Sequence, residues 1–232
     1  MGTSLYNKIV EIGNELVKCP ERCEGIVNSP LDFIPPRCLY LEPKGATTID
    51  CVVIGMNPGK IDEKNKETKY YRENCTRELD YSVLYDYRSD RNDAKSKGHT
   101  NNRFIRTFLN TTKLIPNDSI LWTELCKCQS TEGEPPLQTY RKCMSKYLNH
   151  ELALVKKDTP LICAGKTVYR AMAFRYTEKA VIGIPLPSSR GNDLRRLIND
   201  DKTMENALNF ILEAIENKKA VWISPYKFTK VE

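Results

Sequence analysis

Short β-branched runs alternate with amphipathic helical stretches along this chain, and that alternation is the feature that most constrains its fold. The clearest run covers residues 48–54 and ends at Gly55, the pattern of a buried central strand. Further strands are predicted at residues 38–41, 119–123, 160–165 and 181–185, and helices at residues 5–16, 104–109, 137–156, 165–174 and 204–218. Successive parallel strands need such crossover helices. The sequence therefore predicts an α/β fold, a three-layer α/β/α sandwich with a mostly parallel central sheet, in one domain that spans residues 1–232.

The composition is typical of a soluble globular protein. Hydrophobic residues make up 40% of the chain and charged residues 28%, and no apolar run approaches the ~18 residues of a membrane span. The N-terminal helix lacks the apolar centre of a secretory signal, so we expect a cytoplasmic protein with no membrane partner. The net charge of +6 fits a nucleic-acid partner and a merely solvated surface equally well. Residues 60–100 are rich in charged residues and tyrosine, which predicts a long charged active-site loop.

A turn with two glycines follows the strongest predicted strand. Its sequence is Gly55-Met56-Asn57-Pro58-Gly59. The glycines permit close backbone approach to a ligand, and the proline stiffens the turn. The turn lacks the Lys and Ser/Thr of a phosphate-binding P-loop, and no dinucleotide glycine spacing is present. Ligands of open α/β sheets bind beyond the carboxyl ends of the strands, so we expect the functional site here.

This pentapeptide resembles the first active-site motif of the uracil-DNA glycosylase superfamily, above all its mismatch-specific and single-strand-selective branches. The resemblance implies that Asn57 positions the attacking water. A second segment, which follows the last predicted strand, resembles the superfamily loop that presses on the DNA backbone beside an extruded base. Its residues are Leu186, Pro187, Ser188, Ser189 and Arg190.

Two further segments extend the resemblance over most of residues 17–195. The stretch from Gly98 to Phe104 contains His99 and Asn102 and is similar to the mismatch-specific branch, where such residues open the helix after the long loop. Residues 123–128 resemble the strand-end segment of the iron-sulfur branch, and residues 143–148 resemble the helix that follows it. The resemblance implies that His99, Asn102 and Glu124 contact the base or the DNA.

The chain has nine cysteines, which is many for a protein outside oxidising compartments and favours metal binding. In the iron-sulfur branch, four thiolates hold a 4Fe-4S cluster, and the resemblance implies that these are Cys19, Cys23, Cys128 and Cys143. The first pair has three intervening residues where the family usually has two. Four ordinary buried thiols and a structural zinc remain alternatives. The other cysteines are interpreted as core residues, although the first or the fourth of them is a possible substitute ligand: Cys38, Cys51, Cys75, Cys126 and Cys163.

Two positions depart from the family pattern. Many relatives begin the second motif with a His that donates to the developing oxyanion of the base, and this chain has Leu186. Loss of one such donor typically costs about 10²–10³ in rate, so we expect a slow enzyme, with His99 as one candidate to compensate. Glu124 stands where the iron-sulfur branch has an Asn. An ionised Glu only accepts hydrogen bonds, so the preferred base differs from uracil, or Glu124 is protonated, or it faces away.

The sequence therefore predicts a monofunctional DNA glycosylase that flips out a deaminated or damaged base and hydrolyses its glycosidic bond in base excision repair. Its expected partner is DNA with a damaged or mismatched base, and we expect a monomer. The aromatic platform under the base is expected from the charged loop, with five candidates: Tyr70, Tyr71, Tyr81, Tyr85 and Tyr87. The alternatives are a catalytically silent iron-sulfur protein that binds nucleic acid, and a hydrolase of free nucleosides.

Overall fold

The structure is a computed structural model that describes residues 4–37, 39–62, 64–75, 78–92, 100–187, 192–226 and 229–230. Its main sheet has seven strands, in the spatial order β2-β4-β3-β6-β7-β8-β9. The strands are β2 Tyr40–Glu42, β3 Cys51–Gly55, β4 Ile120–Glu124, β6 Leu161–Ala164, β7 Val181–Ile184, β8 Ala220–Trp222 and β9 Thr229–Lys230. The strands β4, β3, β6, β7 and β8 are parallel, and the edge strands β2 and β9 are antiparallel to their neighbours. The predicted α/β fold with a mostly parallel sheet is confirmed.

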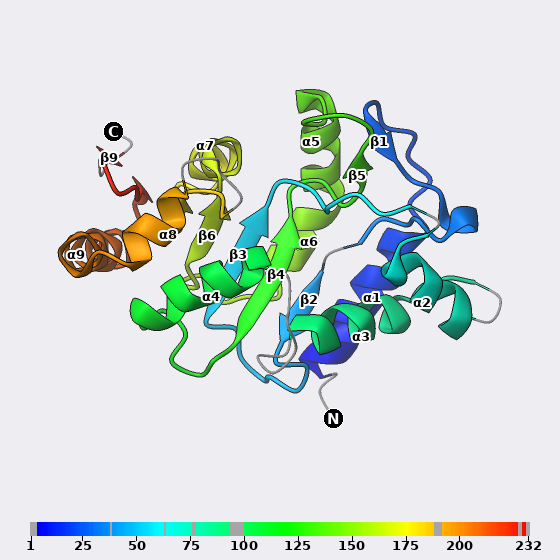
Figure 1. Cartoon of the computed structure of the whole chain (residues 1–232), viewed down its shortest axis with the longest axis horizontal. Helices are drawn as coiled ribbons and strands as arrows, with labels where there is room; N and C mark the ends of the chain where they lie inside the picture. Colours follow the sequence, from blue (N-terminus) through cyan, green and yellow to red (C-terminus); the bar gives the residue numbers. More distant parts are fainter. Residues whose placement is uncertain are drawn as a thin grey trace.

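Helices flank the sheet, and Figure 1 shows α4 in front of the strands and α6 behind them. The helices are α1 Leu5–Val17, α2 Lys66–Asn74, α3 Tyr81–Asn92, α4 Thr100–Thr111, α5 Leu137–Cys143, α6 Asn149–Leu152, α7 Lys166–Arg175, α8 Asp193–Ile198 and α9 Asp201–Asn217. The helix predicted at residues 137–156 is present as far as Leu152, but a π-helical segment, Met144–Leu148, separates α5 from α6. None of the described helices is long and apolar enough to cross a membrane.

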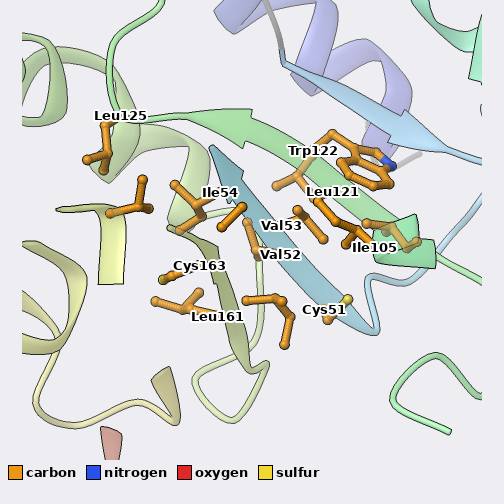
Figure 2. Close-up of a cluster of buried hydrophobic side chains, with 14 of the residues drawn as sticks. Cys51, Val52, Val53, Ile54, Ile105, Leu121, Trp122, Leu125, Leu161 and Cys163 are labelled. Carbon is orange, nitrogen blue, oxygen red and sulfur yellow. The ribbon is translucent and has the colours of Figure 1, made fainter. Parts of the chain in front are cut away.

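The central strands are apolar on both faces because helices cover both. In β3, Cys51, Val52, Val53 and Ile54 are all buried. Figure 2 shows these side chains among those of β4 and β6, with Ile105 of α4 beside them. A parallel sheet covered on both faces produces such continuous apolar runs, which is why the sequence predicted these strands well.

The charged stretch at residues 60–100 was expected to form a loop, and that expectation is wrong where the structure describes it. The stretch contains α2 and α3. Helix α2 begins at an N-cap, Asn65, whose side chain accepts from the backbone N–H of Glu67. Much of the buried surface of these helices comes from tyrosines, because Tyr71, Tyr81 and Tyr85 are almost fully buried, as is Leu84. The two helices were not predicted from the sequence because they contain few aliphatic residues.

The strand order creates a switch point in the sheet. If the parallel strands are numbered along the chain, their spatial order is 2-1-3-4-5, and the chain changes direction between β3 and β6. Connections leave these two neighbouring strands in opposite directions, so a crevice opens beyond their carboxyl ends. The turn at residues 55–59 follows β3 and therefore lies at this crevice.

Candidate functional site

A pocket of about 270 Å³ lies at the switch point. Its walls come from the carboxyl ends of the parallel strands: residues 55–59 after β3, residues 123–124 at the end of β4, Ala164 at the end of β6, and residues 186–187 after β7. Tyr40, Arg88, Asn102 and Trp122 complete much of the lining. The predicted site residues Gly55, Met56, Asn57, Pro58, Gly59, Asn102, Glu124, Leu186 and Pro187 are thus brought together in one pocket.

The turn after β3 is held against the segment after β4 by backbone hydrogen bonds. The N–H of Leu125 donates to the carbonyl of Gly55 at 2.9 Å, and the N–H of Cys126 donates to the carbonyl of Met56 at 2.9 Å. These bonds continue the pairing of β3 with β4 beyond the regular strands. Backbone hydrogen bonds alone therefore hold the turn of the first motif in place.

Asn57 is the candidate that positions water. Its Nδ2 donates to the carbonyl of Pro58 at 3.2 Å and to Oγ of Ser130 at 3.4 Å. Among the described residues, none donates a hydrogen bond to the Oδ1 of Asn57. Because both bonds use the amide nitrogen, the amide oxygen remains available to accept a hydrogen bond from a water in the pocket.

Glu124 is directed into the pocket next to Gly55. A Cβ atom at Gly55 would lie only 2.1 Å from Oε2 of Glu124, so this close approach requires glycine. Oε2 is shielded from solvent and has no hydrogen-bond partner among the described residues. Burial raises the pKa of Glu124 to about 7, although the positive charges of Lys127, Arg88 and Arg37 oppose that shift. Of the three alternatives for Glu124, the one in which it faces away is wrong.

A buried network of charges supports the turn and one wall of the pocket. Arg37 and Glu67 form an ion pair at 3.1 Å with side chains 1% and 4% exposed, and Arg88 contacts the same carboxylate at 2.8 Å. Arg37 also donates to the carbonyl of Gly59. Burial alone would raise the pKa of Glu67, but the guanidinium groups of Arg88 and Arg37 and the hydroxyl of Tyr71 lower it below its usual value. The network thus anchors Gly59 and brings Arg88, from α3, to the pocket.

The aromatic side chains of the pocket are not those expected. Tyr40 and Trp122 lie across the β2–β4 pair and stack with ring centroids 6.0 Å apart. Asn102 donates to the hydroxyl of Tyr40 at 2.8 Å, and the indole N–H of Trp122 donates to Glu42 at 2.7 Å. The five tyrosines proposed from the charged stretch do not line the pocket. Three of them have structural roles, because Tyr81 and Tyr85 hydrogen-bond the backbone of β2 and its approach, and Tyr71 bonds Glu67.

The second motif is described only in part. Leu186 and Pro187 line the pocket, and a Cβ atom at Gly165 would meet Leu186 at 3.0 Å, so the start of this loop packs on the N-terminus of α7. Ser188, Ser189, Arg190 and the predicted His99 lie outside the described residues. Arg88, like Tyr40 and Trp122, lines the pocket and was missed by sequence reasoning. The only available signal was its place within a basic stretch, which did not distinguish it from its neighbours.

The four predicted cysteine ligands surround a second cavity, at the other end of the segment that follows β4. Cys19, Cys23, Cys128 and Cys143 all line it, and Cys126 lines it too. A two-stranded sheet explains the convergence, because β1 Ile26–Val27 pairs with β5 Gln129–Ser130 and places the N-terminal loop beside Cys128. Cys38 lies outside the described residues. Cys51 and Cys163 are buried within the strands β3 and β6, as expected of core residues.

The thiols of this cavity lie close enough to influence one another's ionisation. Burial raises the pKa of Cys128, and the nearby thiols of Cys143, Cys19 and Cys23 raise it further. The backbone N–H of Lys127 donates to Sγ of Cys143 at 3.3 Å, a contact that stabilises a thiolate. No three described His, Cys, Asp or Glu side chains are close enough to hold one metal ion. The four thiols that line this one cavity are the type of donor that an iron-sulfur cluster takes.

A buried lysine joins the pocket to the cysteine cavity. Lys127 lines the cavity, and its Nζ forms an ion pair with Glu151 at 2.6 Å, with both side chains 0% exposed. The same Nζ donates to the carbonyl of Glu124 at 2.7 Å and to the hydroxyl of Thr123. The contacts of Lys127 therefore hold the segment from Glu124 to Cys128 in place. This segment has a pocket residue at one end and a predicted ligand at the other.

Comparison of the chain with protein-family models gives no match, and a search of curated protein sequences finds no relative.

Proposed function

We propose that the protein is a DNA glycosylase, which extrudes a damaged or deaminated base from DNA and hydrolyses its N-glycosidic bond. The observation that carries this proposal is the convergence of Asn57, Asn102, Glu124 and Leu186 in one pocket at the switch point. A volume of about 270 Å³ is near the lower limit of small-molecule pockets and suits a single nucleobase. The stacked pair of Tyr40 and Trp122 supplies the aromatic wall that a base would contact.

The pocket residues supply the parts that the reaction needs. Breaking the glycosidic bond leaves an oxocarbenium-like sugar and an anionic base. Asn57 orients the water that attacks the sugar, because its Oδ1 accepts no hydrogen bond from the described residues. Arg88, held by Glu67 at 2.8 Å, contributes a fixed positive charge in the pocket wall. This charge would stabilise the departing base, which is the role that the resemblance gives to the His that Leu186 replaces here.

We also propose that Cys19, Cys23, Cys128 and Cys143 hold a 4Fe-4S cluster with a structural role. When bound, the cluster would supply covalent ties between the loop after α1, the segment after β4 and the helix α5. The lysines that line the cavity, Lys142 and Lys146, would offset the negative charge of the thiolates. Both lysines pair with Glu21, at 2.5 and 3.1 Å, so their ammonium groups are already fixed at the rim.

A base-release assay tests the catalytic proposal. Oligonucleotides with uracil, hypoxanthine, xanthine, thymine mismatches or alkylated bases are offered to the native protein, to Asn57→Ala and to Asn217→Ala. Asn57→Ala is expected to release its base about 10²-fold more slowly, because the attacking water is no longer positioned. Asn217 lies at the end of α9, where its side chain donates to the carbonyl of Glu213, so the control should match the native rate.

Three results would contradict the proposal. Equal release by native protein and Asn57→Ala would remove Asn57 from the mechanism. No release from any substrate, with tight binding to the same oligonucleotides, would identify the silent nucleic-acid-binding protein. Release of free bases from nucleosides, unchanged by Arg190→Ala, would instead identify the nucleoside hydrolase.

Iron analysis tests the cluster. Protein purified without oxygen is expected to be brown and to contain about four irons per chain. Cys128→Ser should lose most of the iron and the visible absorbance. Cys75→Ser should keep both, because Cys75 caps the C-terminus of α2 and does not line the cavity. A colourless protein with one zinc per chain would contradict the cluster.

A further inference from the structure

Glu124 forms part of the pocket wall at the carboxyl end of β4. Its Oε2 has no hydrogen-bond partner among the described residues and is shielded from solvent beside Gly55. Glu124 is the last residue of β4, and it lines the same pocket as Asn57 and Asn102. A buried polar atom without a partner normally costs stability, and it is tolerated most often where a ligand completes the hydrogen bonds.

The charged groups around Glu124 are turned to other partners. Lys127 directs its Nζ to the backbone carbonyl of Glu124, to Thr123 and to Glu151, and no hydrogen bond joins it to the Glu124 carboxyl. Arg37 and Arg88 both contact Glu67. No described cation therefore forms an ion pair with this carboxyl.

Resting on the proposed glycosylase function, we propose that Glu124 binds the extruded base as a neutral carboxylic acid, and that the preferred bases carry a ring N–H beside a carbonyl. A neutral acid offers one O–H donor and one carbonyl acceptor, and these match that lactam edge in two hydrogen bonds. An ionised carboxylate offers only acceptors, and it would repel the carbonyl of the base. Glu124 in its neutral form thus performs the task that the resemblance gives to an Asn at this position.

Two further features support the neutral acid and the lactam edge. Burial raises the pKa of Glu124 to about 7, despite Lys127, Arg88 and Arg37, while Glu151 adds to the rise. The guanidinium of Arg88 in the pocket wall favours a base that departs as an anion. On a lactam edge part of that charge also spreads onto the carbonyl oxygen, whereas cytosine and adenine carry an amino group at this position. Deamination converts the amidine edge into the lactam edge, so the inferred substrates are deaminated bases.

The test compares the pH dependence of base release by the native protein, Glu124→Gln and Glu216→Gln. Uracil and hypoxanthine oligonucleotides are used between about pH 6 and pH 8.5. The native rate is expected to fall about tenfold for each pH unit above the pKa of Glu124, because only the neutral acid binds the base. Glu124→Gln keeps a donor and an acceptor without a titrating proton, so its rate should be nearly independent of pH. Glu216→Gln, an exposed change on α9, should follow the native profile.

A binding measurement separates failure of this inference from failure of the glycosylase proposal. Oligonucleotides with 2′-fluoro deoxyuridine or 2′-fluoro deoxycytidine resist bond cleavage and report binding alone. If the native protein prefers the uracil oligonucleotide and loses that preference as pH rises, the inference holds even when no base is released. If base is released but native protein and Glu124→Gln share one pH profile, Glu124 does not bind as an acid. Release of cytosine or adenine in preference to uracil and hypoxanthine would overturn the lactam assignment.

Discussion

Replacement of Lys127 by Met is expected to lower the free energy of unfolding by about 3–5 kcal/mol. Lys127 and Glu151 form an ion pair at 2.6 Å, and neither side chain is exposed to solvent. Methionine has nearly the same length but no charge, so the carboxylate of Glu151 would remain buried without its cation. The backbone carbonyl of Glu124 would lose its donor as well. The cost is that of an uncompensated buried charge rather than of lost packing.

Urea denaturation followed by circular dichroism measures this loss in protein with matched iron content. Lys44→Met is the matched control, because Lys44 pairs with Asp86 at 2.6 Å with side chains 47% and 38% exposed. Exposed pairs contribute between zero and about 1 kcal/mol, so the control should be nearly neutral. The double variant Lys127→Met/Glu151→Leu should regain much of the stability, because it buries no unpaired charge. Equal losses of unfolding free energy in Lys127→Met and Lys44→Met would show that the buried pair contributes no more to stability than the exposed pair.

Glu124→Gln is expected to stabilise the protein by about 3 kcal/mol at pH 8 and to have little effect at pH 4.5. The pKa of this carboxyl is raised from 4.5 to about 7 by burial. Between pH 4.5 and about pH 7 the Glu124 carboxyl binds more protons in the folded chain than in the unfolded chain. The contribution of Glu124 to stability therefore falls as pH rises through this range. Above pH 7 the folded protein retains a buried carboxylate, and glutamine removes that cost.

Denaturation midpoints of the native protein and Glu124→Gln at the two pH values measure this effect. The quantity of interest is the gap between the two proteins, because other carboxylates change the stability of both alike. Glu216→Gln, exposed on α9, should show no gap at either pH. A gap of the same size at pH 4.5 and pH 8 would show that Glu124 does not titrate in this range.

The fold was predictable where local pattern and burial agree. Strands β3, β4, β6 and β7 were found from β-branched or apolar runs, because both faces of a parallel sheet are covered. Helices α2 and α3 were missed, because their buried surface is largely aromatic and their sequence is highly charged. Strands β1 and β5 have two residues each, and only their pairing with one another defines them.

The sequence predicted which segments at strand ends form the pocket, but not every side chain that lines it. The turn at residues 55–59 and the residues at the end of β4 follow strands, and the carboxyl ends of parallel strands meet in space. Arg88 and Tyr40 belong to segments that reach the pocket only through tertiary packing. The orientation of Glu124 depends on the missing Cβ of Gly55, which lies 69 positions earlier in the chain. No local pattern contains such a contact.

The stacking of Trp122 on Tyr40 gives the protein a built-in optical probe. The chain has two tryptophans, and only Trp122 lines the pocket, whereas Trp222 packs against Tyr169 of α7. Fluorescence from Trp122 depends on its indole hydrogen bond to Glu42 and on whatever contacts its ring. In a protein whose other tryptophan is replaced by phenylalanine, emission would follow the arrival of a base in real time, without any label on the DNA.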